Sequence, residues 1–340
     1  MKYNELGKTG VLVSELCLGT MTFGGKGMWQ AIGQLPQDEV NQIVKTSLDS
    51  GINFIDTANA YSEGLSETLL GESLKKLGIS HQEVVIATKV RLRMGPGANQ
   101  VGLSRLHIMD SVNDSLQRLQ LSHIDLLYIH GVDPITPLEE TMRGLDDVVR
   151  SGKVRYIGIS NHPAWMVVKA NSYADKMGWT KFVASQNFYS VASRDLEREI
   201  IPMALSEQVS IMPWSPLAGG FLSGKFSRNN AVAGNSRRDS FDFPPINKEK
   251  AYDIIDIMEV VARQHNVSVA TVALNWVIKQ PGITSTIIGA KTLDQLQDNI
   301  KAVTLELSPE EMVQLNEVSA LASEYPGWMV NRQLQGRWPE

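Results

Sequence analysis

Four side chains that can transfer or stabilise a proton stand near the ends of short apolar runs in the sequence. Asp56 ends the run "NFID", Lys89 ends "VVIATK" and His130 ends "IDLLYIH". The fourth, Tyr61, comes five residues after Asp56, just before a helical pattern opens. A strand that only filled a core would not need such groups at its carboxyl end, because burying a charge is costly unless it is paired.

The combination favours acid–base chemistry on a carbonyl group. Asp56 can pair with Lys89, and an ammonium beside a phenol favours the phenolate, which predicts a lowered pKa for Tyr61. A tyrosine tuned in this way suits proton transfer near neutral pH. His130 adds a hydrogen-bond donor, so a carbonyl oxygen could be held between phenol and imidazole while a hydride arrives at the carbon. In the competing interpretation Asp56 only caps a turn and Tyr61 only packs against the next helix.

Eight short apolar runs, most followed by an amphipathic helical pattern, must position these residues. The runs are "ELCLGT", "NFIDTA", "VVIATK", "IDLLYIH", "VRYIGIS", "FVASQN", "VSIMPW" and "STIIGA". Strands without polar alternation are typical of a parallel sheet buried on both faces. Eight βα units in 340 residues favour a (β/α)₈ TIM barrel over a doubly wound sheet. Because barrel active sites lie at the carboxyl ends of the strands, the polar residues that end these runs should converge on one mouth.

Three further segments are expected as additions to a single domain spanning residues 1–340. "YNELGKTGVLVSEL" predicts an N-terminal β-hairpin. Leu222–Lys248 is polar and contains Gly and Pro, which predicts a long loop after the seventh barrel strand. The tail Ser323–Glu340 carries Trp328 and Trp338 with no helical period, and is expected to lie across the barrel mouth.

Composition sets limits on partners and compartment. The net charge is −5 without a dense Lys/Arg block, so we expect neither nucleic acid nor a membrane surface as a partner. Arg237 and Arg238 form one of the two basic clusters and are expected to be solvated in their loop. The single cysteine, Cys17, suits a reducing compartment. Together with a start that lacks the apolar segment of a signal peptide and the absence of a membrane-length apolar run, this predicts a cytoplasmic protein.

The sequence does not predict a metal site. Its six histidines are scattered, with one cysteine and no H-x-x-x-H pair. His81, His107, His123 and His265 fall on predicted helices or turns and are interpreted as surface residues.

Seven segments, in this order along the chain, resemble the aldo-keto reductase superfamily. They are "NFIDTANAYSEGLSETLLGESL", "VVIATKV", "IDLLYIHGVD", "RYIGISN", "SQNFYS", "PWSPLAGGFLSGKF" and "IIGAKTLDQLQDNIKA". The resemblance covers nearly the whole chain. It implies a (β/α)₈ barrel with NADPH lying across the mouth and the reduction of aldehydes or ketones to alcohols. It also implies a catalytic tetrad of Asp56, Tyr61, Lys89 and His130, with Tyr61 as the general acid.

The resemblance implies cofactor residues position by position, and Asp56 is shared between them and the tetrad. Those implied to bind the nicotinamide are Ser160, Asn161, Gln186 and Trp214, the last by stacking its flat apolar face on the ring. Those implied near the pyrophosphate are Ser215, Leu217, Gly219, Gly220 and the clamp residue Lys225. Those implied at the adenosine end are Gly289, Lys291, Gln295, Asp298 and Asn299. Lys291 is the candidate for the 2′-phosphate, while Gln295 stands where other members have an arginine.

The substrate pocket is expected around Tyr61 and His130, with Met21 and Trp29 from the segment after the first strand. Two other functions stay open at this point. Lys89 could be the Schiff-base lysine of a barrel aldolase, although an adjacent Asp56 would raise its pKa. The chain could also be a nucleotide-binding regulatory subunit of the channel-associated type. The physiological substrate and the oligomeric state are not fixed by the sequence.

Overall fold

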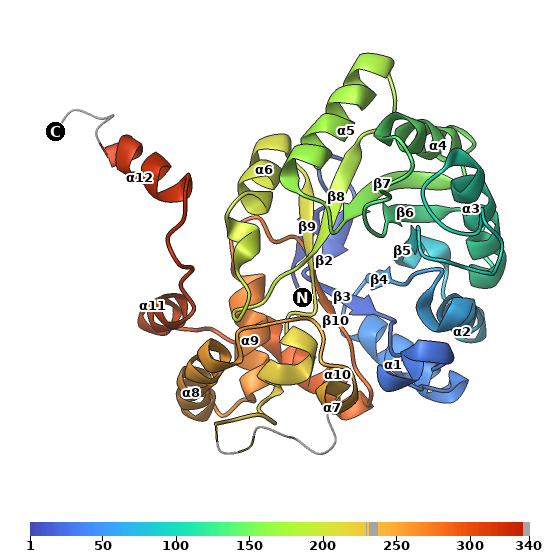
Figure 1. Ribbon diagram of the computed structural model, residues 1–340. Helices are drawn as coiled ribbons and strands as arrows, with labels where there is room; N and C mark the ends of the chain where they lie inside the picture. Colours follow the sequence, from blue (N-terminus) through green and yellow to red (C-terminus); the bar gives the residue numbers. More distant parts are fainter. Residues whose placement is uncertain (229, 231–236, 336–340) are drawn as a thin grey trace.

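Eight parallel strands form the centre of the molecule and alternate with helices (Figure 1). The computed structural model of the protein describes residues 1–228, 230 and 237–335. The strands are β3 (Leu16–Gly19), β4 (Phe54–Asp56), β5 (Val85–Val90), β6 (Ile124–Ile129), β7 (Val154–Ser160), β8 (Phe182–Phe188), β9 (Ser210–Trp214) and β10 (Thr286–Ile288). Their order is β10-β3-β4-β5-β6-β7-β8-β9, and a parallel bridge between Ile211 and Ile283 brings the two ends together. The prediction of a (β/α)₈ barrel is confirmed.

Helices surround this sheet on the outside (Figure 1). They are α1 (Gln37–Asp49), α2 (Leu65–Lys76), α3 (Arg105–Leu119), α4 (Leu138–Arg150), α5 (Ala164–Met177), α6 (Ile200–Glu207), α8 (Lys248–His265), α9 (Val269–Ile278), α10 (Leu293–Ile300) and α11 (Pro309–Val318). α3 shows why such segments are helical: Ser104 caps its first turn by accepting from the His107 N–H, and Ile108, Val112 and Leu119 are buried at helical spacing. No helix among the described residues is long and apolar enough to cross a bilayer.

The predicted N-terminal hairpin closes the barrel at the amino ends of its strands. It consists of β1 (Tyr3–Glu5) and β2 (Leu12–Ser14), which pair antiparallel. Leu6 between them is fully buried with the apolar side chains of the barrel interior. Gly7 has a φ of +59°, and a Cβ there would lie 2.8 Å from the Val183 carbonyl oxygen, so only glycine allows this close approach. The carboxyl ends of the strands therefore form the open mouth.

A long connection leads from β9 to α8, as the sequence predicts. It passes through two short helices, η5 (Ala218–Ser223) and α7 (Arg237–Ser240), before α8 begins. The expected solvation of the arginine pair is wrong for Arg238, whose exposure is only 7%. Its Nε donates to the Ala218 carbonyl oxygen at 2.8 Å, which fixes α7 against η5.

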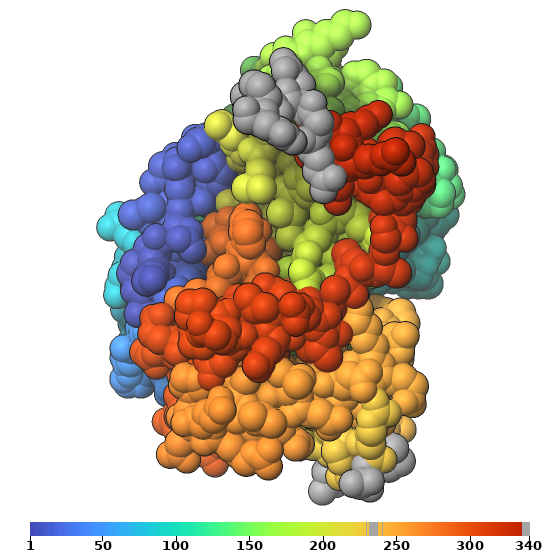
Figure 2. Space-filling model, turned by 90° about the vertical axis from the view of Figure 1, so that its left-hand side faces the viewer, coloured from blue at the N-terminus to red at the C-terminus, as the bar shows by residue number. Residues whose placement is uncertain are grey.

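The tail differs from its prediction. Residues Gly327–Gln335 form a helix, α12, which stands clear of the barrel beside α6 and α11 (Figure 1), and Figure 2 shows this tail on the outside of the molecule. Its connector is held at the start of α6, where Arg198 pairs with Glu324. The expectation of a tail without helical structure across the mouth is therefore wrong for the described residues, since side chains such as Trp328 and Leu334 remain exposed. Trp338 lies outside the described residues.

Candidate active site

The four predicted proton-transfer residues come together at the mouth. Asp56 ends β4 and Lys89 lies in the neighbouring strand β5, and both are buried. The Lys89 ammonium donates to Asp56 Oδ2 at 2.5 Å, to the Thr57 carbonyl oxygen at 2.8 Å and to the Tyr61 hydroxyl oxygen at 3.1 Å. An ammonium has three N–H groups, so all of its donors are used. Because Lys89 donates into the phenol oxygen, the proton of Tyr61 is free to point elsewhere.

A strained turn fixes the position of Tyr61. It begins the short helix η2 (Tyr61–Gly64), in which Ser62 and Glu63 have φ values of +50° and +56°. Left-handed backbone at two successive non-glycine residues costs energy and persists only when the surroundings hold it in place. Here the buried Ser62 hydroxyl donates to the Phe23 carbonyl oxygen at 2.8 Å and accepts from the Gly25 N–H at 2.9 Å. The loop after β3 therefore holds this turn.

Trp29 and His130, two of the residues predicted for a substrate pocket, flank Tyr61. The Trp29 ring packs edge-on against Tyr61 with centroids 5.0 Å apart, and the His130 ring lies 5.8 Å away at 74°. His130 follows β6, and its backbone N–H donates to the Val90 carbonyl oxygen. Its buried Nδ1 has no hydrogen-bond partner among residues 1–228, 230 and 237–335. Met21 is half-buried shortly after β3.

Burial sets the protonation states of these groups. It acts to lower the pKa of Lys89, but the charge of Asp56 and the hydrogen bonds to Asp56 and Tyr61 raise that pKa by more, to above 10.5. Burial lowers the pKa of His130 well below 6.5, and the charge of Lys89 acts in the same direction. Near neutral pH the lysine is therefore charged and the histidine is neutral.

The predicted lowering of the pKa of Tyr61 is wrong in sign. Burial raises the pKa of this phenol above 10, and although the charge of Lys89 opposes the rise, the charge of Asp56 adds to it. Removing a phenolate from water costs more here than the nearby ammonium returns. Tyr61 therefore keeps its proton at neutral pH, which suits a proton donor.

Gln186, which the sequence assigns to the nicotinamide, also contacts the tetrad. Gln186 lies in β8, and its amide nitrogen donates to Asp56 Oδ1 at 2.8 Å. Both carboxylate oxygens of Asp56 are thus hydrogen-bonded, one to Lys89 and one to Gln186. Gln186 therefore helps to orient Asp56, a role that sequence analysis missed because it depends on contact across the barrel interior.

The other residues predicted at the nicotinamide end form a hydrogen-bonded chain along the rim. The Trp214 indole N–H donates to Asn161 Oδ1 at 2.9 Å, and the Asn161 amide nitrogen donates to Ser160 Oγ at 2.9 Å. The Trp214 ring also packs against Phe188 and lies nearly parallel to Phe243, with centroids 5.0 and 5.9 Å away. The indole is thereby held in a fixed orientation at the end of β9.

The loop after β9 contains several residues with left-handed backbone. Ser215, Ala218, Gly219 and Gly220 all have positive φ, between +49° and +92°. The N–H groups of this stretch are bonded within the turn. Those of Ala218 and Gly219 donate to the carbonyl and hydroxyl oxygens of Ser215, each at 2.8 Å, and that of Gly220 donates to the Leu217 carbonyl oxygen at 2.9 Å. A Cβ on Gly220 would meet nothing within 4 Å among the described residues, so the backbone there is open to a ligand. Leu217 precedes η5 in the same loop.

Cations from the loops after β9 and β10 lie within electrostatic reach of one another. Lys291 follows β10, and its pKa is lowered by burial first and then by the charges of Arg237 and Lys225. Burial also lowers the pKa of Arg237 to about 10, and its charge acts on Tyr61 as well. Arg237 therefore lies within electrostatic reach of both the tetrad and Lys291. Sequence analysis missed it, since its only signal was a pair of arginines in a polar loop. Like charges placed together in this way fit a polyanionic ligand such as a dinucleotide phosphate.

The predicted adenosine-end residues hold the loop after β10. Gln295 Oε1 accepts from the Lys291 backbone N–H at 2.8 Å, and the Asn299 amide donates to the Gly289 carbonyl oxygen at 3.2 Å. Asp298 accepts from the Ser268 hydroxyl at 2.5 Å, which joins α10 to α9. These contacts fix the place of Lys291, and contact with adenosine remains a prediction for all of them.

Comparison with known proteins agrees with the fold. Residues 15–320 match the model of the aldo/keto reductase family. The chain belongs to this family.

Three relatives are aligned over most of their length. The chain is 36% identical to the versiconal hemiacetal acetate reductase of Aspergillus parasiticus over 345 residues, covering 96% of this chain and 99% of the relative. It is 36% identical to the norsolorinic acid reductase of Aspergillus flavus, covering 93% and 80%. It is also 33% identical to a probable voltage-gated potassium channel subunit beta of Arabidopsis thaliana, covering 89% and 91%. The family and its named reductases support an oxidoreductase acting on carbonyl groups.

Proposed function

We propose that the protein is an NADPH-dependent reductase that converts an aldehyde or ketone to an alcohol, with Tyr61 as the proton donor. One observation carries this proposal. Lys89, held by Asp56, donates into the hydroxyl oxygen of Tyr61, so the phenol proton can be presented only to another acceptor. Neutral His130 faces the same phenol.

The side chains divide the work of proton transfer. A carbonyl oxygen between Tyr61 and His130 accepts a hydrogen bond from each, which polarises the C=O bond. As the phenol gives its proton to that oxygen, negative charge develops on the Tyr61 oxygen, where the Lys89 ammonium already donates a hydrogen bond. Asp56 keeps Lys89 charged, and Gln186 keeps Asp56 in place. The stabilising groups are thus in position before the charge appears.

The residues present at the mouth fit NADPH. The open backbone at Gly220 leaves room for a pyrophosphate to approach, and Lys225, Arg237 and Lys291 supply positive charge for the phosphates. The face of Trp214 offers support for the nicotinamide ring. When bound, the cofactor supplies the hydride that adds to the carbonyl carbon.

The two other functions left open by the sequence are disfavoured to different degrees. A Schiff-base lysine needs a depressed pKa, whereas the pKa of Lys89 is raised and its three donors are engaged. A regulatory nucleotide-binding subunit has a precedent in the name of the Arabidopsis thaliana relative. Only turnover separates that role from a reductase, because the same tetrad could serve both.

A substrate panel tests the proposal. Aliphatic aldehydes, aromatic aldehydes, sugars and ketones are each mixed with the protein and NADPH, and cofactor absorbance is followed. We expect enzyme-dependent NADPH oxidation with at least one class, at a rate proportional to protein concentration. Tight NADPH binding without turnover on any class would instead favour the regulatory subunit.

A further inference from the structure

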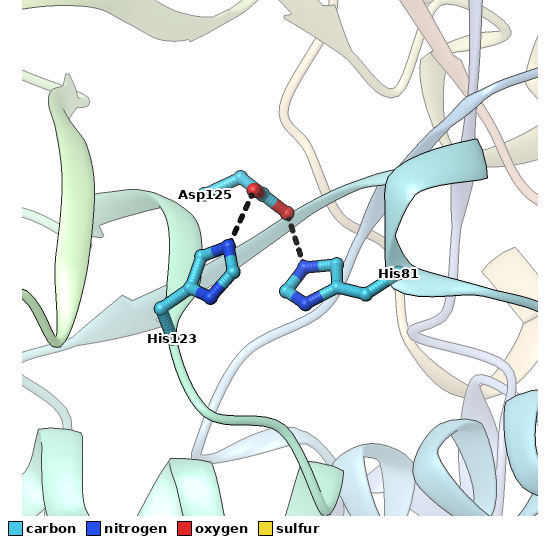
Figure 3. A group of neighbouring side chains, drawn as sticks. All are labelled: His81, His123 and Asp125. Carbon is cyan, nitrogen blue, oxygen red and sulfur yellow. Dashed lines mark hydrogen bonds and ion pairs between the residues drawn. The ribbon is translucent and has the colours of Figure 1, made fainter.

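Two histidines and a carboxylate meet at the end of the barrel opposite the mouth (Figure 3). His81 begins a short helix, η3 (His81–Glu83), which leads into β5, and His123 and Asp125 stand at the start of β6. The carboxyl ends of these same strands carry the candidate active site. The basal cluster of His81, His123 and Asp125 is therefore separated from the tetrad by the length of the strands.

The two imidazoles point towards the same carboxylate. His81 Nε2 lies 2.7 Å from Asp125 Oδ2, and His123 Nε2 lies 3.5 Å from Asp125 Oδ1 (Figure 3). The rings stack with centroids 4.3 Å apart, and one ligand atom from each residue lies within 4.8 Å of the other two. Three potential metal ligands are thus gathered by chain segments about forty residues apart.

Neighbouring groups form hydrogen bonds with these side chains, as is common around metal ligands. The Ile86 N–H donates to Asp125 Oδ2 at 2.8 Å, which fixes the carboxylate. The Ser122 hydroxyl lies 3.1 Å from His123 Nδ1, so the inner ring nitrogen has its own partner and Nε2 is left to bind. Hydrogen bonding at the second ring nitrogen is typical of histidine ligands, since it sets ring orientation and tautomer.

We propose that the basal cluster binds one divalent transition-metal ion, with Zn²⁺ as the expected occupant. Two imidazole nitrogens and a carboxylate oxygen are ligands that zinc prefers, and three protein ligands leave one position for water. The side chains are between 17% and 23% exposed, so water and metal can reach them. Zinc replaces the hydrogen bond between His81 Nε2 and Asp125 Oδ2, and the neutral imidazole then carries its proton on Nδ1.

The two nitrogen–oxygen distances in the cluster are close to those around a zinc ion. Two ligands at about 2.1 Å from a tetrahedral zinc lie roughly 3.4 Å apart. The two nitrogen–oxygen distances of 2.7 and 3.5 Å fall on either side of this value. The charge of Arg155 acts on His123 and opposes a bound cation, so we expect weaker binding than at closed four-ligand sites.

Binding measurements test this site independently of reductase activity. Protein freed of metal with a chelator is titrated with Zn²⁺ by calorimetry, and with Co²⁺ to obtain the visible absorption of a bound ion. We expect binding of one ion per chain and a melting temperature that rises with Zn²⁺. His123→Gln should weaken binding by at least about tenfold and remove that rise, because one of three ligands is lost.

The matched control is His265, which also pairs with a carboxylate. His265 Nε2 lies 2.8 Å from Glu311 Oε1, and no second histidine is grouped with this pair among the described residues. His265→Gln should bind Zn²⁺ like the wild type, while His81→Gln repeats the loss seen with His123→Gln. Circular dichroism of each metal-free variant shows whether it is folded. Equal zinc affinity in wild type, His81→Gln and His123→Gln would overturn the proposal, as would a wild type that binds no stoichiometric ion.

Discussion

Strands β5 and β6 carry ionisable side chains at both ends, and the two groups differ in burial. At the mouth, Lys89 is fully buried beside Asp56, and its ammonium is completely hydrogen-bonded. At the opposite end, the side chains of the basal cluster keep about a fifth of their surface exposed. Both ends therefore place a carboxylate beside nitrogen groups, but the groups at the mouth are shielded from water and those at the base are partly hydrated.

The difference in burial is our reason for placing proton transfer at the mouth. In a buried site a charge is neither screened nor stabilised by water, so its neighbours decide its protonation. The pKa values of Lys89, Tyr61 and His130 are accordingly displaced from their ordinary values. At the base, the partly exposed side chains share this work with water, although burial still lowers the pKa of His123.

Replacing one member of the charge pair at each end should produce the largest difference in stability between the mouth and the base. Lys89→Met should lower the free energy of unfolding by about 3–5 kcal/mol, because it leaves Asp56 buried without its partner charge. Asp125→Asn in the basal cluster should lower it by only about 1 kcal/mol or less, since that pair is partly hydrated. Urea unfolding at neutral pH measures both.

The double variant Lys89→Met/Asp56→Leu is the control for this prediction. Removing both charges should recover part of the lost stability, because no buried charge is then left unpaired. Equal losses for Lys89→Met and Asp125→Asn, or no recovery in the double variant, would contradict the role given to burial.

Replacing the cations at the mouth should reduce the preference for NADPH over NADH. Lys291→Met should remove about 1–3 kcal/mol of the preference for NADPH over NADH, the range of a charge-assisted contact. Arg237→Met should also weaken NADPH binding, because the charge of Arg237 acts on Lys291 and therefore also on a phosphate bound there. Fluorescence quenching measures both cofactors. Trp214→Ala is the control and should weaken both alike, and equal wild-type affinity for the two cofactors would refute a phosphate site here.

The smallest effect is expected from pH. The proposed mechanism needs Tyr61 protonated and His130 neutral. Because the pKa of His130 lies well below 6.5, its imidazole stays neutral as the pH falls to 6.5. Because the pKa of Tyr61 is raised above 10, its phenol keeps its proton as the pH rises towards 10. The rate of carbonyl reduction should therefore change little between about pH 7 and pH 9. A decline centred near pH 8 would show that one of these groups titrates in that range.

The barrel and the tetrad could be predicted because their signals are local in the sequence. Each strand is an uninterrupted apolar run, and the polar residue that ends it must lie at the mouth once the strands are parallel. Asp56, Lys89 and His130 follow from this rule alone. The hairpin and the long loop after β9 likewise have compositions that interrupt the repeat.

Other features depend on contacts that no local pattern contains. Arg237 reaches the mouth through a long loop, and Gln186 meets Asp56 across the barrel. His81 and His123 are brought together by the parallel pairing of β5 with β6, so a search for closely spaced ligands misses them. The sign of the shift in the pKa of Tyr61 required knowing how far burial outweighs the charge of Lys89.

The most direct test of Tyr61 as proton donor is the steady-state kinetics of Tyr61→Phe. This change removes one oxygen and leaves the ring packed against Trp29 and His130. Carbonyl reduction should fall by at least about 10²–10⁴-fold, the range for general acid catalysis, while NADPH affinity by fluorescence stays at the wild-type value. A variant that binds NADPH normally and keeps most of its activity would contradict the account and place the acid on another residue.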